Sequence, residues 1–387
     1  MAQLTKYLPD VGWTPQVICS EWTRETTSKF DPKFGGDAVR ESVVGRVAPP
    51  RDLTTPKTLV DKVEKLGRLL AGYRNPKEWT AAVIAEGRQA LRGAKVDVIL
   101  ATFPFRAALY AADQLSREFR IPWIADFRDV FEESTLKWRW GWERYNERRV
   151  LRSAALITTV SSALAEALRA RHQQDVRILP NGFDPEDFVT QSRRETEKFT
   201  ILYAGSLHPP GSHVRVSPKV LFQAVDYLAE RGNIDVKDIE LRFLGTTFAK
   251  LDAHLVDTGC RNLVRVDEWV SRSEVVAWEQ GAHLLLLLGS DEMKGILTAK
   301  VFEYLAARRR ILAIPSDGDC IDRLLARSGA GVSASSMEDV ATCVADAYAE
   351  WKISQGVRCD SDEDVIAEYD RRLQSEILAA WMSEIAL

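Results

Sequence analysis

A lysine and a glutamate that could hold a nucleotide lie close together in the segment SDEMKGILTAKVFEYLAARRRILAIP, residues 290–315. Lys300 and Glu303 stand on one face of a helix expected to begin at Thr298 or Ala299. The first N–H groups of a helix have no partners within it and attract anions, phosphate above all. A lysine adds a cation for a diphosphate, and a glutamate can hold the two hydroxyls of a ribose. The segment predicts a nucleoside diphosphate site, with an ordinary exposed Lys–Glu pair as the alternative.

The same segment contains a glycine that would let a bulky anion approach the backbone. Gly295 precedes the helix, and no capping box closes the helix start, because Val301 stands three residues after Thr298 in place of Glu or Gln. We expect a second cation, Arg215, to reach this site from another loop. Lys300 and Arg215 would then stabilise a leaving diphosphate as catalytic residues. The alternative for Arg215 is a surface arginine.

Charged residues also follow an apolar run in the first half of the chain. Asp126, Arg128 and Asp129 come directly after IPWIA, residues 121–125. Residues at the carboxyl end of a parallel strand face the ligand in open α/β sheets. We therefore expect Asp126 to act in catalysis and Arg128 to face the acceptor. The alternative is an Arg–Asp network that only fixes the end of the strand.

The elements that would position these side chains are short apolar runs alternating with segments of helical period. The expected strands are Gln16–Glu21, Arg40–Val47, Val96–Thr102, Ile121–Ala125, Ala155–Val160, Val176–Leu179, Phe199–Gly205, Ile239–Leu244, Leu263–Val266, His283–Leu288, Ile311–Ile314 and Gly331–Ala334. Because the alternation occurs twice, on either side of a polar linker at residues 185–197, it predicts two doubly wound α/β domains with parallel sheets. Ligands would bind at the strand carboxyl ends, in a cleft between the domains.

Two further segments have patterns of their own. Residues 362–387 carry one apolar stripe and predict a single long amphipathic helix. Residues 138–142, WRWGW, could meet an anionic membrane surface or pack between helices.

Composition limits the classes of function. The chain has 387 residues, 45% of them hydrophobic, and a net charge of −4, which gives no sign of nucleic-acid binding. No apolar run approaches the roughly 18 residues that span a bilayer, and the N-terminus has no signal-peptide core. Five cysteines and five histidines form no cluster with metal-ligand spacing. Unpaired thiols in a reducing cytoplasm, and no bound metal, are therefore expected.

Five motifs resemble those of one family. The chain contains, in order, IPWIADFRD, ALITTVSSALAEAL, ILPNGFD, ILYAGSL and KGILTAKVFEYLAA. In this order they resemble the GT-B glycosyltransferases of the group 1, GT4-like kind. The resemblance implies two Rossmann-like domains facing a cleft, and transfer of a sugar from a nucleotide donor with retention at the anomeric carbon and without a metal ion. It divides the chain into an acceptor domain at 1–185, a nucleotide-sugar domain at 198–361, and a helix at 362–387 that crosses back to the first domain.

The resemblance also implies roles for single residues. Glu303 matches the second glutamate of the family's E-x7-E motif, which holds the donor ribose, whereas Gly295 stands in the place of the first glutamate. Gly205-Ser206 matches a Gly-Arg pair of many relatives, which leaves Arg215 or Lys219 as the nearest replacement cations. The further contacts implied for the nucleotide sugar are Gly205, Ser206, Gly245, Val270, Gly295, Ile296 and Leu297, and those for the acceptor are Phe103, Arg106 and Arg128.

The chain departs from the family pattern at its start. Relatives begin with a strand and a glycine-rich loop before the first helix. Here Leu4, Leu8 and Val11 already have helical spacing and Gly12 ends that helix. We therefore expect the first strand to be missing, or its place to be taken by another segment.

We expect a retaining, metal-independent, hexosyltransferase-like glycosyltransferase of polysaccharide or glycoconjugate biosynthesis. A nucleotide sugar would be its co-substrate, and its acceptor a glycan, a lipid-linked molecule or a small molecule. It would work in the cytoplasm, with peripheral contact at the inner membrane face left open. Two alternatives are a nucleotide-sugar 2-epimerase-like enzyme and a non-catalytic GT-B binding or partner subunit.

Overall fold

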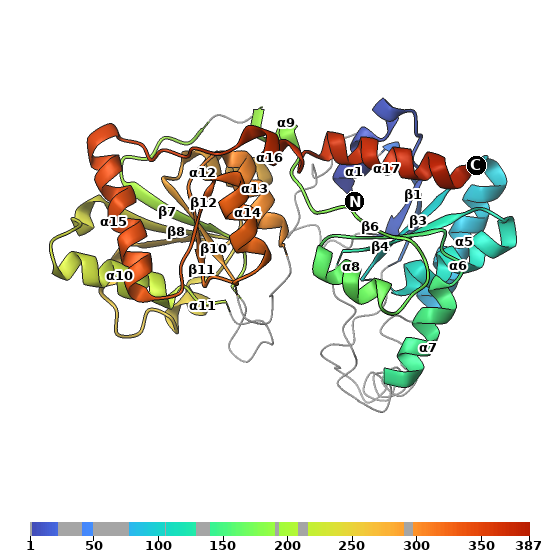
Figure 1. Ribbon diagram of the computed structural model, residues 1–387, viewed down its shortest axis with the longest axis horizontal. Helices are drawn as coiled ribbons and strands as arrows, with labels where there is room; N and C mark the ends of the chain where they lie inside the picture. Colours follow the sequence, from blue (N-terminus) through green and yellow to red (C-terminus); the bar gives the residue numbers. More distant parts are fainter. Residues whose placement is uncertain are drawn as a thin grey trace. The chain divides into compact units, whose positions relative to one another are not determined.

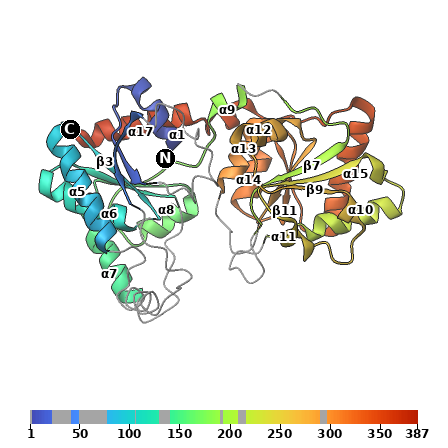
Figure 2. The same cartoon turned by 180° about the vertical axis from the view of Figure 1, so that it is seen from behind.

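The computed structural model describes residues 2–21, 41–48, 77–104, 106–128, 140–189, 193–207, 216–289 and 297–387. Contacts divide the chain into two compact units (Figures 1 and 2). The first unit comprises Met1–Pro180 together with Gln374–Leu387, and the second is Asn181–Leu373.

The first unit contains a four-stranded parallel sheet in the order β3-β4-β5-β6. Its strands are β3 Ile99–Phe103, β4 Trp123–Phe127, β5 Leu156–Thr159 and β6 Val176–Ile178. All of β4 and β5 is buried, which explains why their sequences are nearly unbroken apolar runs. Two earlier strands, β1 Val17–Ser20 and β2 Val43–Val47, pair in parallel as a separate sheet. Among the described residues, β3 pairs with β4 alone and so forms one edge of the four-stranded sheet.

Helices cover both faces of this first sheet. One face packs on α6 Arg106–Phe119, α7 Trp140–Leu151 and α8 Ser162–Arg169. The opposite face packs on α1 Ala2–Tyr7 and on α17 Arg371–Ala386. A further helix, α5 Lys77–Gly93, packs against α6. Alternating β4 residues serve the two faces, since Trp123 and Ala125 pack on one and Ile124 on the other.

The second unit contains a six-stranded parallel sheet in the order β12-β11-β10-β7-β8-β9. The strands are β7 Phe199–Ala204, β8 Ile239–Leu244, β9 Val264–Asp267, β10 Leu284–Leu288, β11 Ile311–Ile314 and β12 Gly331–Ser333. The order turns back at β7, from which one half of the sheet runs to β9 and the other to β12. The expected parallel, doubly wound architecture is confirmed. A change of direction of this kind is where open α/β sheets bind ligands.

Two apolar cores lie on the two faces of the second sheet. One is formed with α10 Lys219–Glu230 and α15 Met337–Ser354, and the other with α12 Arg272–Gly281, α13 Ala299–Ala307 and α14 Cys320–Ser328. Figure 1 shows these helix groups on opposite sides of the strands. Short helices lie at the edges: η3 Val236–Asp238, α11 Phe248–Asp252 and η4 Gly259–Asn262.

The C-terminal segment is not the single helix that its apolar stripe predicts. It forms α16 Glu363–Ala367 and then α17, separated by a short break. At the break, Phe183 N–H donates to Tyr369 O at 3.0 Å and Arg371 N–H donates to Phe183 O at 3.1 Å. Ile366 and Tyr369 are buried in the second unit, whereas Leu378 and Met382 pack on Leu4, Ile124 and Leu156 of the first. The stripe therefore serves two cores, and the backbone bonds to Phe183 interrupt the helix between them.

Residues 185–197 are not only a linker, since they begin with a short helix, α9 Pro185–Val189, whose Phe188 packs on the second unit's core.

At the N-terminus the expected first helix is α1 followed by a 3-10 turn, η1 Pro9–Val11, which Gly12 ends at φ 84°. All five cysteines are free thiols. Within the described ranges, no helix is long and apolar enough to cross a membrane.

Candidate functional site

Two glycines form the carboxyl edge of the second sheet where β7 and β8 end. Gly205 has φ 150° and Gly245 has φ 80°, conformations that favour glycine. Gly205 N–H donates to Leu244 O at 2.8 Å, and Gly245 N–H donates to Asp267 O at 2.8 Å. A Cβ at Gly245 would lie 3.6 Å from the Gly205 carbonyl carbon, so the two loops are in contact. The two glycines predicted to contact the nucleotide sugar therefore lie side by side, and their role in binding stays a prediction.

Lys300, at the start of α13, reaches across to the first of these loops. Its Nζ donates to Tyr203 Oη at 3.2 Å and lies 5.0 Å from the centre of the Tyr203 ring. A Cβ at Gly205 would lie 2.4 Å from the same Nζ. The absence of a side chain at Gly205 therefore makes room for the lysine, and the ammonium group is held at the strand end rather than on the helix surface.

A second ammonium group, from Lys250, lies at the same loop, and the sequence reading missed it. Lys250 Nζ donates to Ser206 Oγ at 2.9 Å. It belongs to α11, whose first turn is capped by Thr247 Oγ1. The only signal in the sequence was a lysine soon after the end of β8. Lys300 and Lys250 bring two positive charges to the adjoining residues Gly205 and Ser206, an arrangement suited to a diphosphate.

The start of α13 matches the expected helix start. Thr298 is the N-cap, with extended backbone and no hydrogen bond from its side chain to the helix. Leu297 is half-buried against the apolar core. Three of the residues predicted here, Arg215, Gly295 and Ile296, lie outside the described residues, as do Asp129 and the histidines His208 and His213.

Glu303 is paired with an arginine, not with Lys300. Arg272 Nη1 lies 2.8 Å from Glu303 Oε1, and Arg272 Nε donates to Asp187 Oδ2 at 3.1 Å. Arg272 begins α12 and Asp187 belongs to α9, so three separate helices meet at this network. The side chain of Glu303 is 22% exposed, and that of Arg272 is 17% exposed. The exposed Lys–Glu alternative is wrong, because the two residues contact different partners.

A fully buried carboxyl group, that of Glu279 on α12, belongs to the same network. Neither of its oxygens has a hydrogen-bond partner among the described residues. Burial, followed by the nearby charge of Glu303, raises the pKa of Glu279 well above its usual value, against the opposing effect of Arg272. Burial alone would lower the pKa of Arg272, but the carboxyl groups of Glu303, Glu279 and Asp187 outweigh it and raise that pKa. Burial and the charge of Glu303 therefore favour the protonated form of Glu279, while Arg272 holds Glu303.

The residue expected beside the nucleotide base lies close to this arginine in the chain. Val270 is half-buried and packs on the core formed with α12 and α13. It directly precedes Ser271, which caps α12 in a capping box with Glu274. The cap fixes the start of α12, and with it both Val270 and Arg272.

In the first unit, Asp126 and Arg128 form an internal network. Arg128 Nε donates to Asp126 Oδ2 at 2.8 Å, and Thr158 Oγ1 donates to Asp126 Oδ1 at 2.8 Å. Arg128 Nη1 also donates to Leu179 O at 3.2 Å. Asp126 is 1% exposed and both its oxygens are taken. This geometry favours the structural alternative, in which the pair ties the ends of β4, β5 and β6 together.

The aromatic residue expected to face the acceptor belongs to the core. Phe103 is 4% exposed and stacks on Phe127 with ring centroids 5.2 Å apart. The expectation for Phe103 is therefore wrong, because an aromatic at the end of β3 turns inward, as the alternation of the strand requires. Arg106, the first residue of α6, is half-buried. In the WRWGW segment, Trp138 and Arg139 lie outside the described residues.

Among the described residues no group of three or more His, Cys, Asp or Glu side chains could hold a metal ion.

Comparisons with known proteins agree with this architecture. Residues 1–187 match the model of Glycosyltransferase Family 4. A glycosyltransferase from Rickettsia africae ESF-5 has a TM-score of 0.66 at 11% identity, with 99% of this chain and 93% of that one covered. Anabaena Alr3699/HepE in complex with UDP-glucose has a TM-score of 0.60 at 12% identity, covering 95% of this chain and 99% of that one. A UDP-N-acetylglucosamine 2-epimerase has a TM-score of 0.56 at 11% identity, covering 98% and 92%.

At these identities the structural likeness concerns the fold, and no curated protein sequence matches the chain significantly. The family match over residues 1–187 and the fold of the glycosyltransferase neighbours both support a GT4-like glycosyltransferase.

Proposed function

We propose that the chain transfers a sugar from a nucleoside diphosphate donor to an acceptor hydroxyl, with retention at the anomeric carbon. The observation that carries the proposal is the pair of ammonium groups, Lys300 and Lys250, at the Gly205-Ser206 loop. Both lie at the point where the second sheet changes direction, which is the usual ligand position of a doubly wound sheet.

The diphosphate would lie against this loop and the start of α13. As the bond between the sugar and the diphosphate breaks, negative charge develops on the leaving group. Lys300, Lys250 and the first N–H groups of α13, which the Thr298 side chain does not cap, would stabilise that charge. Lys250 takes the part that the resemblance gave to a missing arginine, and Arg215 keeps the role proposed from the sequence.

The ribose would be held by Glu303, whose carboxylate is oriented by Arg272. One carboxylate oxygen is bonded to a guanidinium, which fixes the rotamer of Glu303. The other oxygen would therefore be oriented to accept a hydrogen bond from a sugar hydroxyl. Val270 would lie beside the base. A UDP donor is the first to test, because Anabaena HepE binds UDP-glucose on the same fold.

The acceptor would be a glycan, a lipid-linked molecule or a small molecule, contacted on the first unit near Arg106. Asp126 and Arg128 would position the strand ends beneath it rather than take part in the chemistry. The reaction needs no metal in this proposal, since the two lysines and the helix start supply the charge that a cation would. Polysaccharide or glycoconjugate biosynthesis is the setting that fits these substrates.

The test begins with calorimetry of UDP and a panel of nucleotide sugars. The double variant Lys250→Ala/Lys300→Ala should lose UDP affinity by about a hundredfold, because two charge-assisted contacts are removed. Lys237→Ala, an exposed lysine on η3, is the matched control and should bind as the unaltered chain does. Equal UDP affinity in the double variant and the control would overturn the site.

Product analysis tests the reaction itself. With donor and acceptor present, NMR of the product should show the anomeric configuration of the donor retained, and excess EDTA should leave the rate unchanged. Isomerisation of the donor at C2 without an acceptor would instead indicate an epimerase. UDP binding with no turnover of any donor would indicate a binding subunit.

A further inference from the structure

One phenol hydroxyl, that of Tyr203, lies between the loop and the lysine of the candidate diphosphate site. Tyr203 Oη accepts a hydrogen bond from Lys300 Nζ at 3.2 Å and donates one to Ser206 O at 3.4 Å. Because its proton is directed to the backbone of the loop, the oxygen presents a lone pair to the ammonium group. Ser206 is also the residue whose Oγ accepts from Lys250 Nζ. The hydroxyl therefore links one lysine to the residue that binds the other.

The ring of Tyr203 is fixed before any ligand binds. It is 1% exposed and packs in the core formed with α10 and α15, with its centroid 5.9 Å from that of Phe243. Lys300 belongs to α13, which packs on the opposite face of the sheet. Its side chain reaches the hydroxyl over Gly205, where a Cβ would lie 2.3 Å from Lys300 Cε and 3.3 Å from Tyr203 Oη. A buried ring therefore anchors the charged end of a side chain with a flexible four-carbon stem.

A second tyrosine, Tyr304, holds α13 itself to the same strand. The Ala204 N–H donates to Tyr304 Oη at 2.9 Å, and Tyr304 is fully buried. Ala204 lies beyond the last residue that β7 pairs with β10, so a side chain of the helix bonds to the strand past the end of that pairing. Lys300 and Tyr304 are four residues apart and share one face of α13. That face is bound to two successive residues of β7, which fixes the backbone of the lysine as well as its ammonium group.

This linkage bears on the reaction because negative charge develops on the leaving group only as its bond to the sugar breaks. Donors already in place stabilise that charge without reorganising, whereas a mobile ammonium group must first be ordered. We propose that Tyr203 is a positioning residue, whose hydroxyl holds the ammonium group of Lys300 over Gly205, ready for a diphosphate. The proposal rests on the proposed function, since it takes the diphosphate to lie at this loop.

Removing the hydroxyl alone tests this role. Tyr203→Phe keeps the buried ring and its contact with the ammonium group, 5.0 Å from the ring centre, so the chain should still fold. UDP should bind about 2- to 10-fold more weakly, because the lysine side chain must then be ordered as the ligand binds. The kcat should fall by about tenfold, since a donor to the leaving group is no longer held in place. Calorimetry and initial rates measure the two effects, with ADP or GDP in place of UDP if the unaltered chain binds either more tightly.

A double-mutant cycle with Lys300→Ala shows whether the hydroxyl acts through the lysine. If it does, Tyr203→Phe should change the affinity for the nucleoside diphosphate by less than about twofold once the lysine is absent. A tyrosine with a purely structural role would weaken binding by the same factor in both backgrounds. Equal losses with and without Lys300 would therefore overturn the proposal.

The matched control is another buried tyrosine hydroxyl of the second unit. Tyr348 Oη donates to Asp238 Oδ2 at 2.8 Å and accepts from the Asp235 N–H at 3.2 Å. Tyr348→Phe thus removes as many hydrogen bonds as Tyr203→Phe does, but none at the loop. It should bind the nucleoside diphosphate as the unaltered chain does and keep its kcat.

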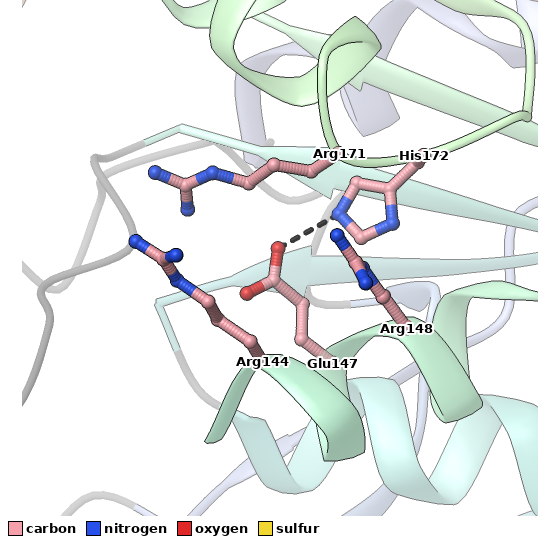
Figure 3. A pocket seen from close by; sticks show the side chains of 5 residues that line it. All are labelled: Arg144, Glu147, Arg148, Arg171 and His172. Atoms are coloured by element: carbon pink, nitrogen blue, oxygen red, sulfur yellow. Dashed lines mark hydrogen bonds and ion pairs between the residues drawn. The ribbon is translucent and has the colours of Figure 1, made fainter. Parts of the chain in front are cut away.

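A second control separates loss of stability from loss of position. In the first unit, His172 Nε2 and Glu147 Oε1 are 2.8 Å apart, and their side chains are only 2% and 3% exposed (Figure 3). His172→Gln disturbs this buried pair and should lower the melting temperature while leaving nucleoside diphosphate affinity unchanged. If either control weakened binding as much as Tyr203→Phe, the effect would be one of stability and the proposal would be wrong.

Failure of the proposed function has a different signature from failure of this inference. An unaltered chain that binds none of UDP, ADP, GDP and the nucleotide sugars would overturn the diphosphate site, and the role of Tyr203 with it. An unaltered chain that binds one of them, with Tyr203→Phe indistinguishable from the two controls, would overturn the role of Tyr203 alone.

Discussion

Charged residues lie at the carboxyl edges of both sheets, but their partners differ between the two units. In the second unit, Lys300 and Lys250 bring positive charge to the adjoining residues Gly205 and Ser206. In the first unit, Arg128 and Asp126 bond to each other and to neighbouring strand ends, and the carboxylate is fully buried. The first arrangement leaves charge for a ligand, and the second uses charge to hold strands together.

The largest effect should come from breaking the internal network. Asp126→Ala leaves the largely buried guanidinium of Arg128 without the Asp126 carboxylate, and should lower the free energy of unfolding by about 3–5 kcal/mol. Denaturant unfolding measures the change. A variant that unfolds at the unaltered denaturant concentration but has lost turnover would mean that Asp126 is catalytic, and the contrast between the two edges would fail.

The second effect concerns turnover rather than stability. Lys300→Ala should lower kcat by about a hundredfold, because one preorganised donor to the leaving group is lost. Its melting temperature should stay close to that of the unaltered chain, since the variant loses one hydrogen bond and one cation–π contact, both with Tyr203 at the strand end. Turnover and melting are measured on the same preparation, and a large fall in melting temperature would give Lys300 the structural role that Asp126 has.

The third prediction separates holding the nucleotide from orienting the group that holds it. Glu303→Ala should weaken nucleoside diphosphate binding by about 10- to 100-fold, as expected for one charged hydrogen bond. Arg272→Ala should also weaken binding of the donor, measured as a higher KM, since Glu303 loses its fixed partner.

A double-mutant cycle decides between the two explanations. If Arg272 acts through Glu303, the double variant binds no worse than Glu303→Ala alone. Additive losses would mean that Arg272 contacts the nucleotide itself. Calorimetry with UDP is suitable for all four proteins.

The smallest effect concerns pH. The pKa of Glu279 is raised in the folded chain, so folding favours the protonated carboxyl. Between the usual glutamate pKa and the raised pKa of Glu279, the unfolded chain releases this proton more readily than the folded chain, so the group contributes less stability as pH rises. Glu279→Gln removes that dependence, and should melt higher than the unaltered chain at pH 7 but not at pH 4. Each kcal/mol gained corresponds to about 2–4 °C. Identical pH profiles of melting temperature would mean that Glu279 is ionised in the folded chain.

The sequence predicted the strands of the second unit closely, because buried parallel strands are short apolar runs with sharp ends. Ile311–Ile314 and Ile239–Leu244 were predicted with the bounds observed. Lys300, Glu303 and the two glycines were found from their positions after strands and at a helix start. Their role as a site stays a prediction, which the variants above test.

The partners of these residues could not be read from the sequence. Lys250 lies in a short helix, where its sequence position does not distinguish it from an ordinary exposed lysine. Arg272 directly follows Ser271, and this part of the sequence indicates only the start of a helix. Phe103 was placed on the wrong side because alternation along β3 is visible only once the strand's bounds are known. Contacts between elements distant in the chain decide all three.

The position of α17 at the end of the chain affects the order in which the two units can fold during synthesis. The last helix completes the core around Leu4, Ile124 and Leu156, yet the ribosome synthesises it after the whole of Asn181–Leu373. At synthesis rates of roughly 5–20 residues per second, the intervening unit takes about 10–40 seconds. During that time the second unit, which is continuous in the chain, can fold as it emerges, while the first lacks the part of one apolar core that α17 supplies. The half of the protein that is translated first is therefore the last to finish folding, and its nascent form is the one that chaperones would bind.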